Sequence, residues 1–531
     1  MRRKKEIQVC SCTKFADSIT LDGPTGPASE RCGQADSGQT RSVRVQDGPV
    51  RHLQRYSSAD RVLRGPFVQH APTNMIQSTQ DPAPKFQAVI RSNVEKTPQW
   101  ASLDPELREG IEVLSLVLPF RTNKYVMDEL IDWTNVPNDP IFNLVFPRSG
   151  MLEEDEFNEV RDLVRNEAAK PEIDAAVERI RNRLNPHPAG QMTHNVPHVD
   201  GEPIPGLQHK YRETVLFFPA HGQTCHAYCT FCFRWAQFIG DEDLKFANKE
   251  VDQLLRYLRQ HPEVSDVLFT GGDPMVMKAK VLERYIRPIL EDPELEHIRT
   301  IRIGTKSVAY WPQRYVSDAD ADDVLRLFED VVKSGRTLGI MGHYSHGVEL
   351  KTGVSREAIR RIRNTGANIR MQSPVIRHVN DDAGIWKDMW REGADQGLIP
   401  YYMFVERDTG PKKWFELPLV DVWNIFREAY RELSGICRTV RGPSMSAFPG
   451  KVHVLGPVDL AGGKALALEY LQCRNPEMVR RPFFAKYSTT ASWFDELEPL
   501  TEADAKFWPG NWDSDSISEE GIPLTVGSSD E

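Results

Sequence analysis

The strongest constraint on the fold is a sixfold alternation between residues 213 and 435, in which a short apolar run precedes each longer amphipathic stretch. Such an alternation is typical of parallel strands joined by helical crossovers. We therefore predict an α/β fold, an incomplete (β/α)6 barrel of the TIM type, with its chemistry at the carboxyl ends of the strands. The expected strands are residues 214–219, 266–270, 300–304, 338–342, 368–372 and 400–405.

Other regions flank this unit of residues 209–435. Residues 1–85 are rich in Gly, Ser, Pro, Gln and Arg and show no sustained period, so we expect them to be disordered. Residues 86–208 form a predicted helical N-terminal region, with helical patterns such as 104–118 and 153–183. Beyond the barrel we expect a C-terminal region over residues 436–500 and an acidic tail over 501–531.

Composition excludes several classes of protein. No apolar run approaches the roughly 20 residues of a membrane span, and a net charge of -10 argues against nucleic-acid binding. Eight cysteines in 531 residues do not indicate a disulfide scaffold, so we expect a reducing compartment and a cytoplasmic location. Arginines between positions 41 and 64 leave organellar targeting as an alternative.

Three cysteines follow the first expected strand in the spacing C-x3-C-x2-C: Cys225, Cys229 and Cys232. Three thiolates on one loop can hold a 4Fe-4S cubane and leave one iron open to another ligand. A zinc site is the alternative, because His221 or His226 would complete a set of four ligands. Three unrelated cysteines are the third possibility.

A glycine turn, Gly271-Gly272-Asp273, closes the second expected strand. With the cysteine spacing it resembles the signature of the radical S-adenosylmethionine enzymes. That resemblance implies that the open iron of the cluster binds S-adenosylmethionine and that Gly271, Gly272 and Asp273 contact this cofactor. It also implies that reduction releases a 5′-deoxyadenosyl radical, chemistry that belongs to the cofactor.

Within that superfamily, residues 97–460 resemble the lysine 2,3-aminomutase family. Order and identity agree in the segments 209–211, 232–234, 302–305, 343–346, 370–373, 379–381 and 400–402. The resemblance implies an isomerase that moves an amino group from the α to the β carbon of an amino acid. It implies that Gln372 and Ser373 bind cofactor and that Arg234 pairs with the substrate carboxylate.

The same family uses pyridoxal phosphate, held as a Schiff base by a lysine in a glycine-rich stretch. Lys451 in Pro449-Gly450-Lys451 matches that lysine, although the glycine run is shortened and Lys464 is a second candidate. Lys210 and Tyr211 match residues that hold the cofactor phosphate. Lys210 replaces an arginine, however, and Thr214 stands where the family has another, so the phosphate site is altered.

Substrate choice is where the resemblance weakens. The lysine enzymes bind the distant ammonium group with two acidic side chains. Here Ser446 lies near one of these positions and Glu406-Arg407-Asp408 lies at the other. Arg407 is the best-aligned residue of the three, and Asp408 substitutes only with a shift of one residue. Cys437 and Cys473 cannot form the structural zinc site that some relatives carry. The sequence therefore leaves the amino acid open.

Three hypotheses follow. The first is an aminomutase that uses pyridoxal phosphate, with a small amino acid substrate and a reductase or ferredoxin-type electron donor, and with self-association as an option. The second is a radical enzyme of the same barrel that has lost pyridoxal phosphate and acts on a peptide or protein side chain. The third is a noncatalytic cluster or zinc protein. None of them involves nucleic acid or a membrane.

Overall fold

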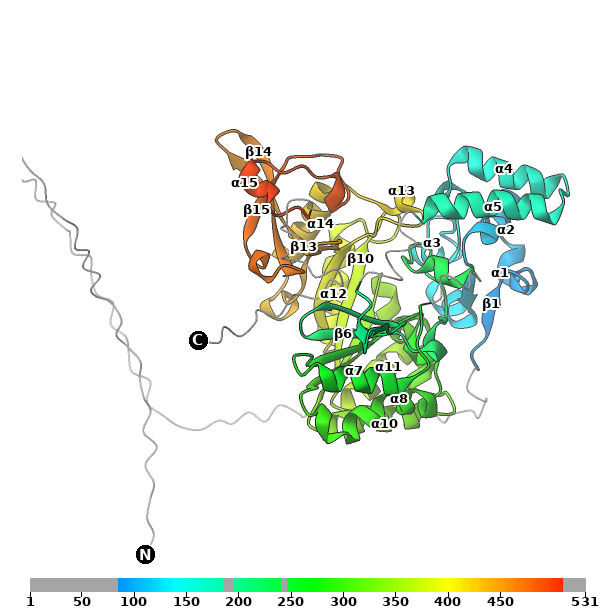
Figure 1. Ribbon diagram of the computed structural model, residues 1–531. Coiled ribbons are helices and arrows are strands. Elements are labelled where there is room, and N and C mark those ends of the chain that lie inside the picture. The colour runs from blue at the N-terminus through cyan, green and yellow to red at the C-terminus, as the bar shows by residue number, and fades with distance from the viewer. Residues whose placement is uncertain (1–84, 186–194, 240–245, 510–531) are drawn as a thin grey trace, which may run out of the picture. The chain divides into compact units, whose positions relative to one another are not determined.

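A computed structural model describes residues 85–185, 195–239 and 246–509 of the chain (Figure 1). The disorder predicted for the N-terminus therefore falls outside the described residues, apart from residue 85. The same holds for the acidic tail beyond residue 509. Residues 501–509 fold: helix α15 (Glu502–Ala505) lies among them, and Phe507 stacks on Phe483 with ring centroids 4.6 Å apart.

Six parallel strands form the centre of a large sheet, and each lies beside the next one along the chain. Their bounds agree with the sequence prediction to within three residues, because each apolar run fills the interior beside its neighbours. They are β6 (Thr214–Phe217), β7 (Asp266–Phe269), β8 (Thr300–Thr305), β9 (Thr337–His343), β10 (Asn368–Val375) and β11 (Ile399–Val405).

Amphipathic helices connect these strands and bury their apolar faces against the sheet. Consecutive helices pack on one another, as α7, α8, α10 and α11 do in Figure 1. Capping residues fix several starts; for example, the Asp382 carboxylate accepts hydrogen bonds from the backbone of Gly384 and Ile385. The helices are α7 (Val251–Gln260), α8 (Ala279–Glu291), α10 (Ala321–Lys333), α11 (Gly353–Asn364), α12 (Ala383–Asp395) and α14 (Leu419–Arg431).

The sheet extends beyond the six predicted strands, to eleven in the described part of the chain. Strand β5 (Leu207–Tyr211) pairs antiparallel with β6 at one edge. Beyond β11, strand β12 (Arg441–Ser446) continues the sheet in parallel, and three antiparallel strands complete it. These three are β13 (Gly450–Leu460), β14 (Gly463–Cys473) and β15 (Pro482–Lys486). The sequence analysis did not anticipate this C-terminal sheet.

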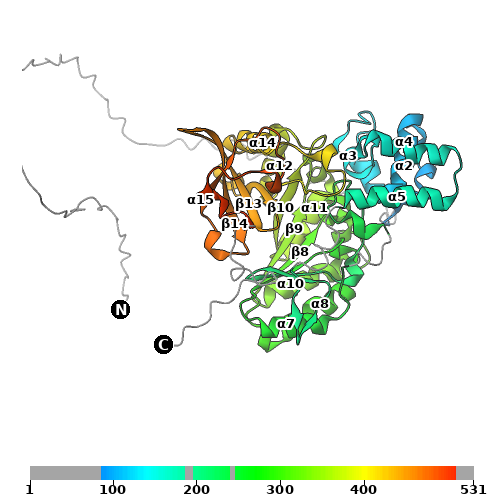
Figure 2. The same ribbon diagram turned by 45° about the horizontal axis from the view of Figure 1, so that its top comes forward.

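The described part of the N-terminal region consists mainly of helices. Figures 1 and 2 both show its helices on one side of the central sheet, with β13, β14 and α15 on the other. A short pair of strands, β1 (Ala88–Ile90) and β2 (Arg121–Asn123), accompanies the helices. The longer helices are α2 (Pro105–Val117), α4 (Glu154–Arg165) and α5 (Lys170–Leu184).

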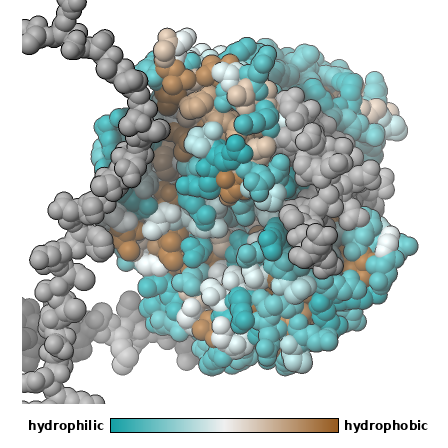
Figure 3. All heavy atoms as spheres, turned by 60° about the vertical axis from the view of Figure 1, so that its left-hand side comes forward, coloured by the Kyte–Doolittle hydropathy of each residue, from teal (hydrophilic) through white to brown (hydrophobic). Residues whose placement is uncertain are grey.

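Figure 3 turns forward the side on which Figure 1 places β14 and β15, and apolar side chains gather on its upper part. Large apolar side chains left exposed between residues 436 and 460 include Ile436, Phe448, Leu455 and Leu460. Across the described residues, every helix is too short or too polar to cross a membrane.

Candidate functional site

The cysteine loop follows the carboxyl end of β6, as expected. Cys225, Cys229 and Cys232 are each partly buried, and the backbone N–H of Cys232 donates to the carbonyl of Cys229 at 3.0 Å. A turn of this kind presents several thiols on one short segment. All three therefore lie at the end of the sheet where parallel α/β proteins carry their chemistry.

The N-terminal region supports this loop from outside. The backbone N–H of Tyr228 donates to Arg121 of β2 at 2.8 Å, and that of Thr230 donates to Leu144 of α3 (Pro140–Val145) at 2.9 Å. The fully buried amide of Asn123 donates to the His226 carbonyl at 3.2 Å. Sequence reasoning missed this role because the partners lie about a hundred residues apart and no local pattern connects them.

The glycine turn lies directly against the cysteine loop. The backbone N–H of Asp273 donates to the carbonyls of Gly222 at 3.0 Å and Thr224 at 2.7 Å. A Cβ at Gly272 would lie 2.4 Å from the Thr224 carbonyl oxygen, so only glycine permits this approach. The structure thus brings together the two motifs on which the cluster prediction rested.

The carboxylate of Asp273 is buried and bonded to the loop after β8. It accepts from the Thr305 hydroxyl at 2.7 Å and from the backbone N–H groups of Lys306 at 2.9 Å and Ser307 at 3.1 Å. Burial raises its pKa to about 6, although these hydrogen bonds oppose the rise. Asp273 therefore anchors the turn, and its contact with S-adenosylmethionine stays a prediction.

Burial raises the pKa of all three loop thiols, to about 12 for Cys229 and about 11 for Cys232. Each thiolate would therefore need a nearby cation. Lys306 lowers the pKa of Cys229, and Arg234 that of Cys232 and Cys225, but burial outweighs both. Bound iron would supply the missing positive charge, so the loop suits a thiolate-bound metal group.

No group of three or more His, Cys, Asp or Glu side chains in the described part of the chain converges on a point where one metal ion could bind. A cubane does not require such convergence, because each cysteine binds a different iron. His226, an alternative zinc ligand, is buried with its ring 5.4 Å from that of Phe86, and burial lowers its pKa to about 3.

Arg234 follows the cysteine loop and is buried, with 6% of its surface exposed. Its guanidinium donates to the amide oxygens of Gln223 and Gln237 and lies 4.3 Å from the centroid of the Phe218 ring. Its Nε has no hydrogen-bond partner, and the charged groups of the described residues that act on it are the thiols of Cys232 and Cys225 rather than a carboxylate. The guanidinium could therefore bind a carboxylate ligand by donating hydrogen bonds to it.

Lys451 lies near the start of β13, opposite Ser446 of β12 and Gln472 of β14. Its amine is 4.1 Å from the centroid of the Tyr402 ring. Burial, with smaller contributions from Arg441 and Arg302, lowers its pKa to about 7. A lysine in this state has a large neutral, nucleophilic fraction near neutral pH.

Lys464 occupies a different place. It is exposed beside the turn that joins β13 to β14, opposite Asp459 in the antiparallel ladder. Asp459 lies eight positions after Lys451, which corresponds to roughly 25 Å along the strand. Lys464 is therefore remote from the other candidate residues, and Lys451 stays the better candidate for the predicted Schiff base.

Lys210 and Tyr211 end strand β5. The Lys210 amine donates to the Ala447 carbonyl at 2.7 Å, which places it at the loop that leads to Lys451. Burial lowers the pKa of Lys210 well below its usual range, and Arg474, Arg407 and Lys451 lower it further. Burial raises the pKa of Tyr211.

The Thr214 hydroxyl, which stands where the family has an arginine, donates to Asp266 at 3.2 Å. Asp266 also pairs with Arg302 at 2.6 Å. Position 214 is therefore part of a polar contact between neighbouring strands.

Gln372 and Ser373 lie on β10, and the Ser373 hydroxyl donates to that of Ser345 at 3.2 Å. Beside them is a buried ion pair that sequence reasoning missed, between Lys306 and Glu349 at 2.8 Å. The one available signal was a basic residue two positions after the third predicted strand.

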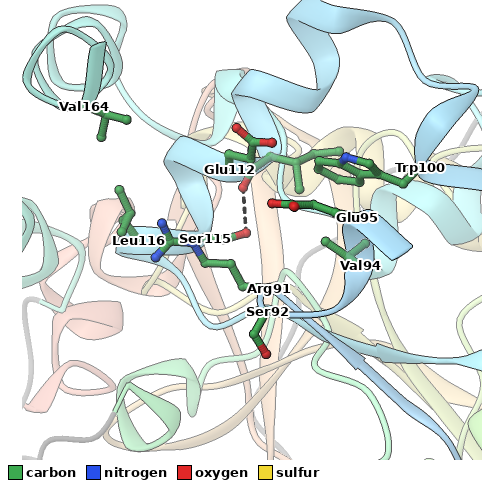
Figure 4. A pocket seen from close by; sticks show the side chains of 10 residues that line it. Arg91, Ser92, Val94, Glu95, Trp100, Glu112, Ser115, Leu116 and Val164 are labelled. Atoms are coloured by element: carbon green, nitrogen blue, oxygen red, sulfur yellow. Dashed lines mark hydrogen bonds between the residues drawn. The ribbon is translucent and has the colours of Figure 1, made fainter. Parts of the chain in front are cut away.

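A cavity of about 400 Å³ lies apart from these residues, in the N-terminal region (Figure 4). Arg91, Glu95 and Glu112 lie around it beside the Trp100 ring. Its lining comes from residues 91–116 and Val164, and includes none of the candidate site residues. We therefore treat it as separate from the site.

Comparison with curated proteins places the chain in a family. A protein of Aquifex aeolicus named for L-lysine 2,3-aminomutase is 30% identical over 395 residues, which is 74% of this chain and 92% of the relative. The chain belongs to the lysine 2,3-aminomutase family of radical S-adenosylmethionine enzymes.

More distant relatives agree with that assignment. The L-lysine 2,3-aminomutase of Acetoanaerobium sticklandii is 26% identical over 65% of this chain and 71% of its own length. That of Escherichia coli is 26% identical over 48% of this chain and 69% of its own length. Homology thus confirms the family that the sequence motifs predicted.

Other comparisons add little. No family model matches the chain. Among solved structures, Streptococcus suis SuiB bound to S-adenosylmethionine aligns with a TM-score of 0.29 and 10% identity, over 52% of this chain and 56% of that one.

The contact between the glycine turn and the cysteine loop generates a prediction. Gly272→Ala should displace the backbone of residues 222–224 and cost about 1–3 kcal/mol of stability, because the added Cβ meets backbone atoms. The midpoint temperature of thermal unfolding and the iron content after anaerobic reconstitution should both fall. Gly353→Ala is the control, since nothing lies within 4 Å of its added Cβ; equal behaviour of the two variants would refute the close-contact argument.

The cysteine loop generates a second prediction. Cys225→Ala should lose most of the iron and sulfide and the electron paramagnetic resonance signal of the reduced cluster, because a thiolate ligand is removed. Cys437→Ala is a matched control, since Cys437 is buried elsewhere in the chain. Stoichiometric zinc in place of iron in the wild-type protein would contradict the cluster assignment.

Proposed function

We propose that this protein is a radical S-adenosylmethionine aminomutase that uses pyridoxal phosphate and moves the amino group of an amino acid from the α to the β carbon. The observation that carries the proposal is the position of Lys451. Burial lowers the pKa of its amine to about 7. Lys451 follows the loop whose Ala447 carbonyl accepts a hydrogen bond from Lys210, and its strand belongs to the same sheet as β6, which precedes the cysteine loop.

We also propose that the sheet curves into the predicted incomplete barrel. Strands β5 and β12 stand seven places apart in the strand order, roughly 33 Å across a flat sheet. Lys210 of β5 nevertheless donates a hydrogen bond to Ala447, just beyond the end of β12. The two strands come within reach of one side chain only if the sheet curves. This contact supports the barrel.

The residues of the site have separable tasks. When bound, the iron–sulfur cluster and S-adenosylmethionine supply a carbon-centred radical, and pyridoxal phosphate supplies an aldehyde that holds the amino group. Lys451 provides a neutral amine without a separate base, because its pKa is already lowered. Arg234 orients the substrate carboxylate from a buried position, where the charge pair is little screened.

Substrate selectivity follows from the charge at the end of β11. The Arg407 guanidinium lies 5.3 Å from the Phe233 ring centroid and 5.6 Å from that of Trp493, with Asp408 at 3.6 Å. Phe233 directly follows Cys232, so a cation stands between the cysteine loop and the C-terminal segment. The neighbouring acids offset this cation only in part, because Asp408 approaches Arg407 no closer than 3.6 Å and burial disfavours the charged form of Glu406. A distant ammonium group is therefore repelled. We propose an amino acid without one as the substrate, and a reductase or ferredoxin-type protein as the electron donor.

Lys451 gives the decisive test of the function. Lys451→Ala should abolish the visible absorbance of lysine-bound pyridoxal phosphate, whereas the exposed Lys464→Ala should retain it. Below its pKa the amine is protonated and cannot attack, so adduct formation should be about tenfold slower at pH 6 than at its plateau above about pH 8. An adduct that survives Lys451→Ala would refute the assignment.

A related result would favour the second candidate function. Deoxyadenosine formation by reduced protein without pyridoxal phosphate would indicate a radical enzyme that acts on another substrate. The replacement of the family's arginines by Lys210 and Thr214 is the observation that motivates this alternative.

The substrate argument generates a further prediction. When reduced enzyme and S-adenosylmethionine are incubated with single amino acids, lysine should be converted at least about tenfold less efficiently than the best substrate. Like-charge repulsion of roughly 1.4 kcal/mol accounts for that factor. Mass spectrometry of β-amino acid products provides the measurement. Arg407→Asp should shift preference toward lysine, and lysine as the best wild-type substrate would overturn the argument.

A further inference from the structure

Arg474 is fixed to the loop that precedes Lys451. It follows the end of β14, has 4% of its surface exposed, and donates from Nε to the Phe448 carbonyl at 2.9 Å. Its guanidinium lies 4.6 Å from the centroid of the Phe448 ring, and its backbone N–H donates to the Pro449 carbonyl at 3.0 Å. Main chain and side chain together position the guanidinium at residues 448–449.

Lys210 reaches the neighbouring carbonyl of the same loop. Its amine donates to Ala447 at 2.7 Å, while Arg474 donates to Phe448 at 2.9 Å. Two cations from strands far apart in the sheet therefore meet at consecutive residues, three to four positions before Lys451. Tyr211, next to Lys210, lies within the electrostatic influence of Arg474 as well.

Several basic side chains lie within electrostatic reach of Lys210 at this loop. Arg474, Arg407 and Lys451 all disfavour the charged form of Lys210, and Asp408 lies 3.6 Å from Arg407. Guanidinium and ammonium groups that meet at one buried loop offer several hydrogen-bond donors to an anionic ligand. A phosphate group suits such a place, because a guanidinium binds it through two donors and an ammonium adds a point charge.

We propose that Arg474 binds the phosphate group of the pyridoxal cofactor together with Lys210 and Tyr211. Arg474 thereby takes the place of the arginines that the family carries where this chain has Lys210 and Thr214. The assignment rests on the proposed function, since it presumes that Lys451 holds the cofactor. It also accounts for the shortened glycine run, because Arg474 fixes the loop that those glycines would otherwise shape.

The test compares two aldehydes that differ only in the phosphate. Wild type, Arg474→Gln and Arg474→Lys are titrated with pyridoxal phosphate and with pyridoxal, and the absorbance of the lysine adduct reports binding. Loss of a charge-assisted contact should weaken pyridoxal phosphate binding about 10- to 100-fold in Arg474→Gln and less in Arg474→Lys. Binding of pyridoxal should change less than about twofold, since it has no phosphate to lose. Arg481→Gln, at an exposed arginine, is the matched control and should behave as wild type.

Each outcome decides the assignment. Unchanged affinity for pyridoxal phosphate in Arg474→Gln overturns it. Equal weakening of both aldehydes also overturns it, because Arg474 would then only support the loop. If wild type forms no Lys451-dependent adduct with either aldehyde, the proposed function fails first and this assignment fails with it. Selective weakening of the phosphorylated aldehyde supports both.

Discussion

The close approach of the glycine turn to the cysteine loop is the contact on which the geometry of the site depends. Without side chains at Gly271 and Gly272, the turn after β7 lies against the backbone of residues 222–224, so that Asp273 can donate to two of its carbonyls. The Asp273 carboxylate then holds the backbone of Lys306 and Ser307 after β8. Three consecutive loops are therefore fixed by backbone contacts that leave little freedom for the cysteines.

A buried ion pair extends this network to the next strands. The Lys306 amine donates to the Ser345 hydroxyl at 3.1 Å and pairs with Glu349 at 2.8 Å, while Glu349 also accepts from the Ser345 backbone at 2.6 Å. Ser373 of β10 bonds to Ser345. Polar contacts thus link the ends of β7, β8, β9 and β10. Such a network holds its members in one arrangement, which is what a site that must orient reactive groups requires.

The sequence could predict the parallel strands and the chemical motifs because each rests on local information. Apolar runs mark the strands, and the spacing of Cys225, Cys229 and Cys232 marks their loop without reference to distant residues. The C-terminal strands were missed in part because β12 and β13 each contain a Gly-Pro pair, which normally marks a turn rather than a strand. The support of the cysteine loop by Asn123 was missed because it depends on tertiary contacts alone.

The cofactor lysine shows how both kinds of information combine. The motif around Lys451 identified a candidate, but Lys464 was a second one until the β13–β14 ladder placed it at an exposed turn. Likewise, Lys210 and Thr214 suggested a weakened phosphate site when read along the chain. In space, Arg474 reaches the same loop as Lys210, because β14 pairs with β13 and carries its final residues past Pro449. The replacement that we propose for the missing arginines therefore comes from a distant strand, and its position depends on the three-dimensional arrangement rather than on the motif.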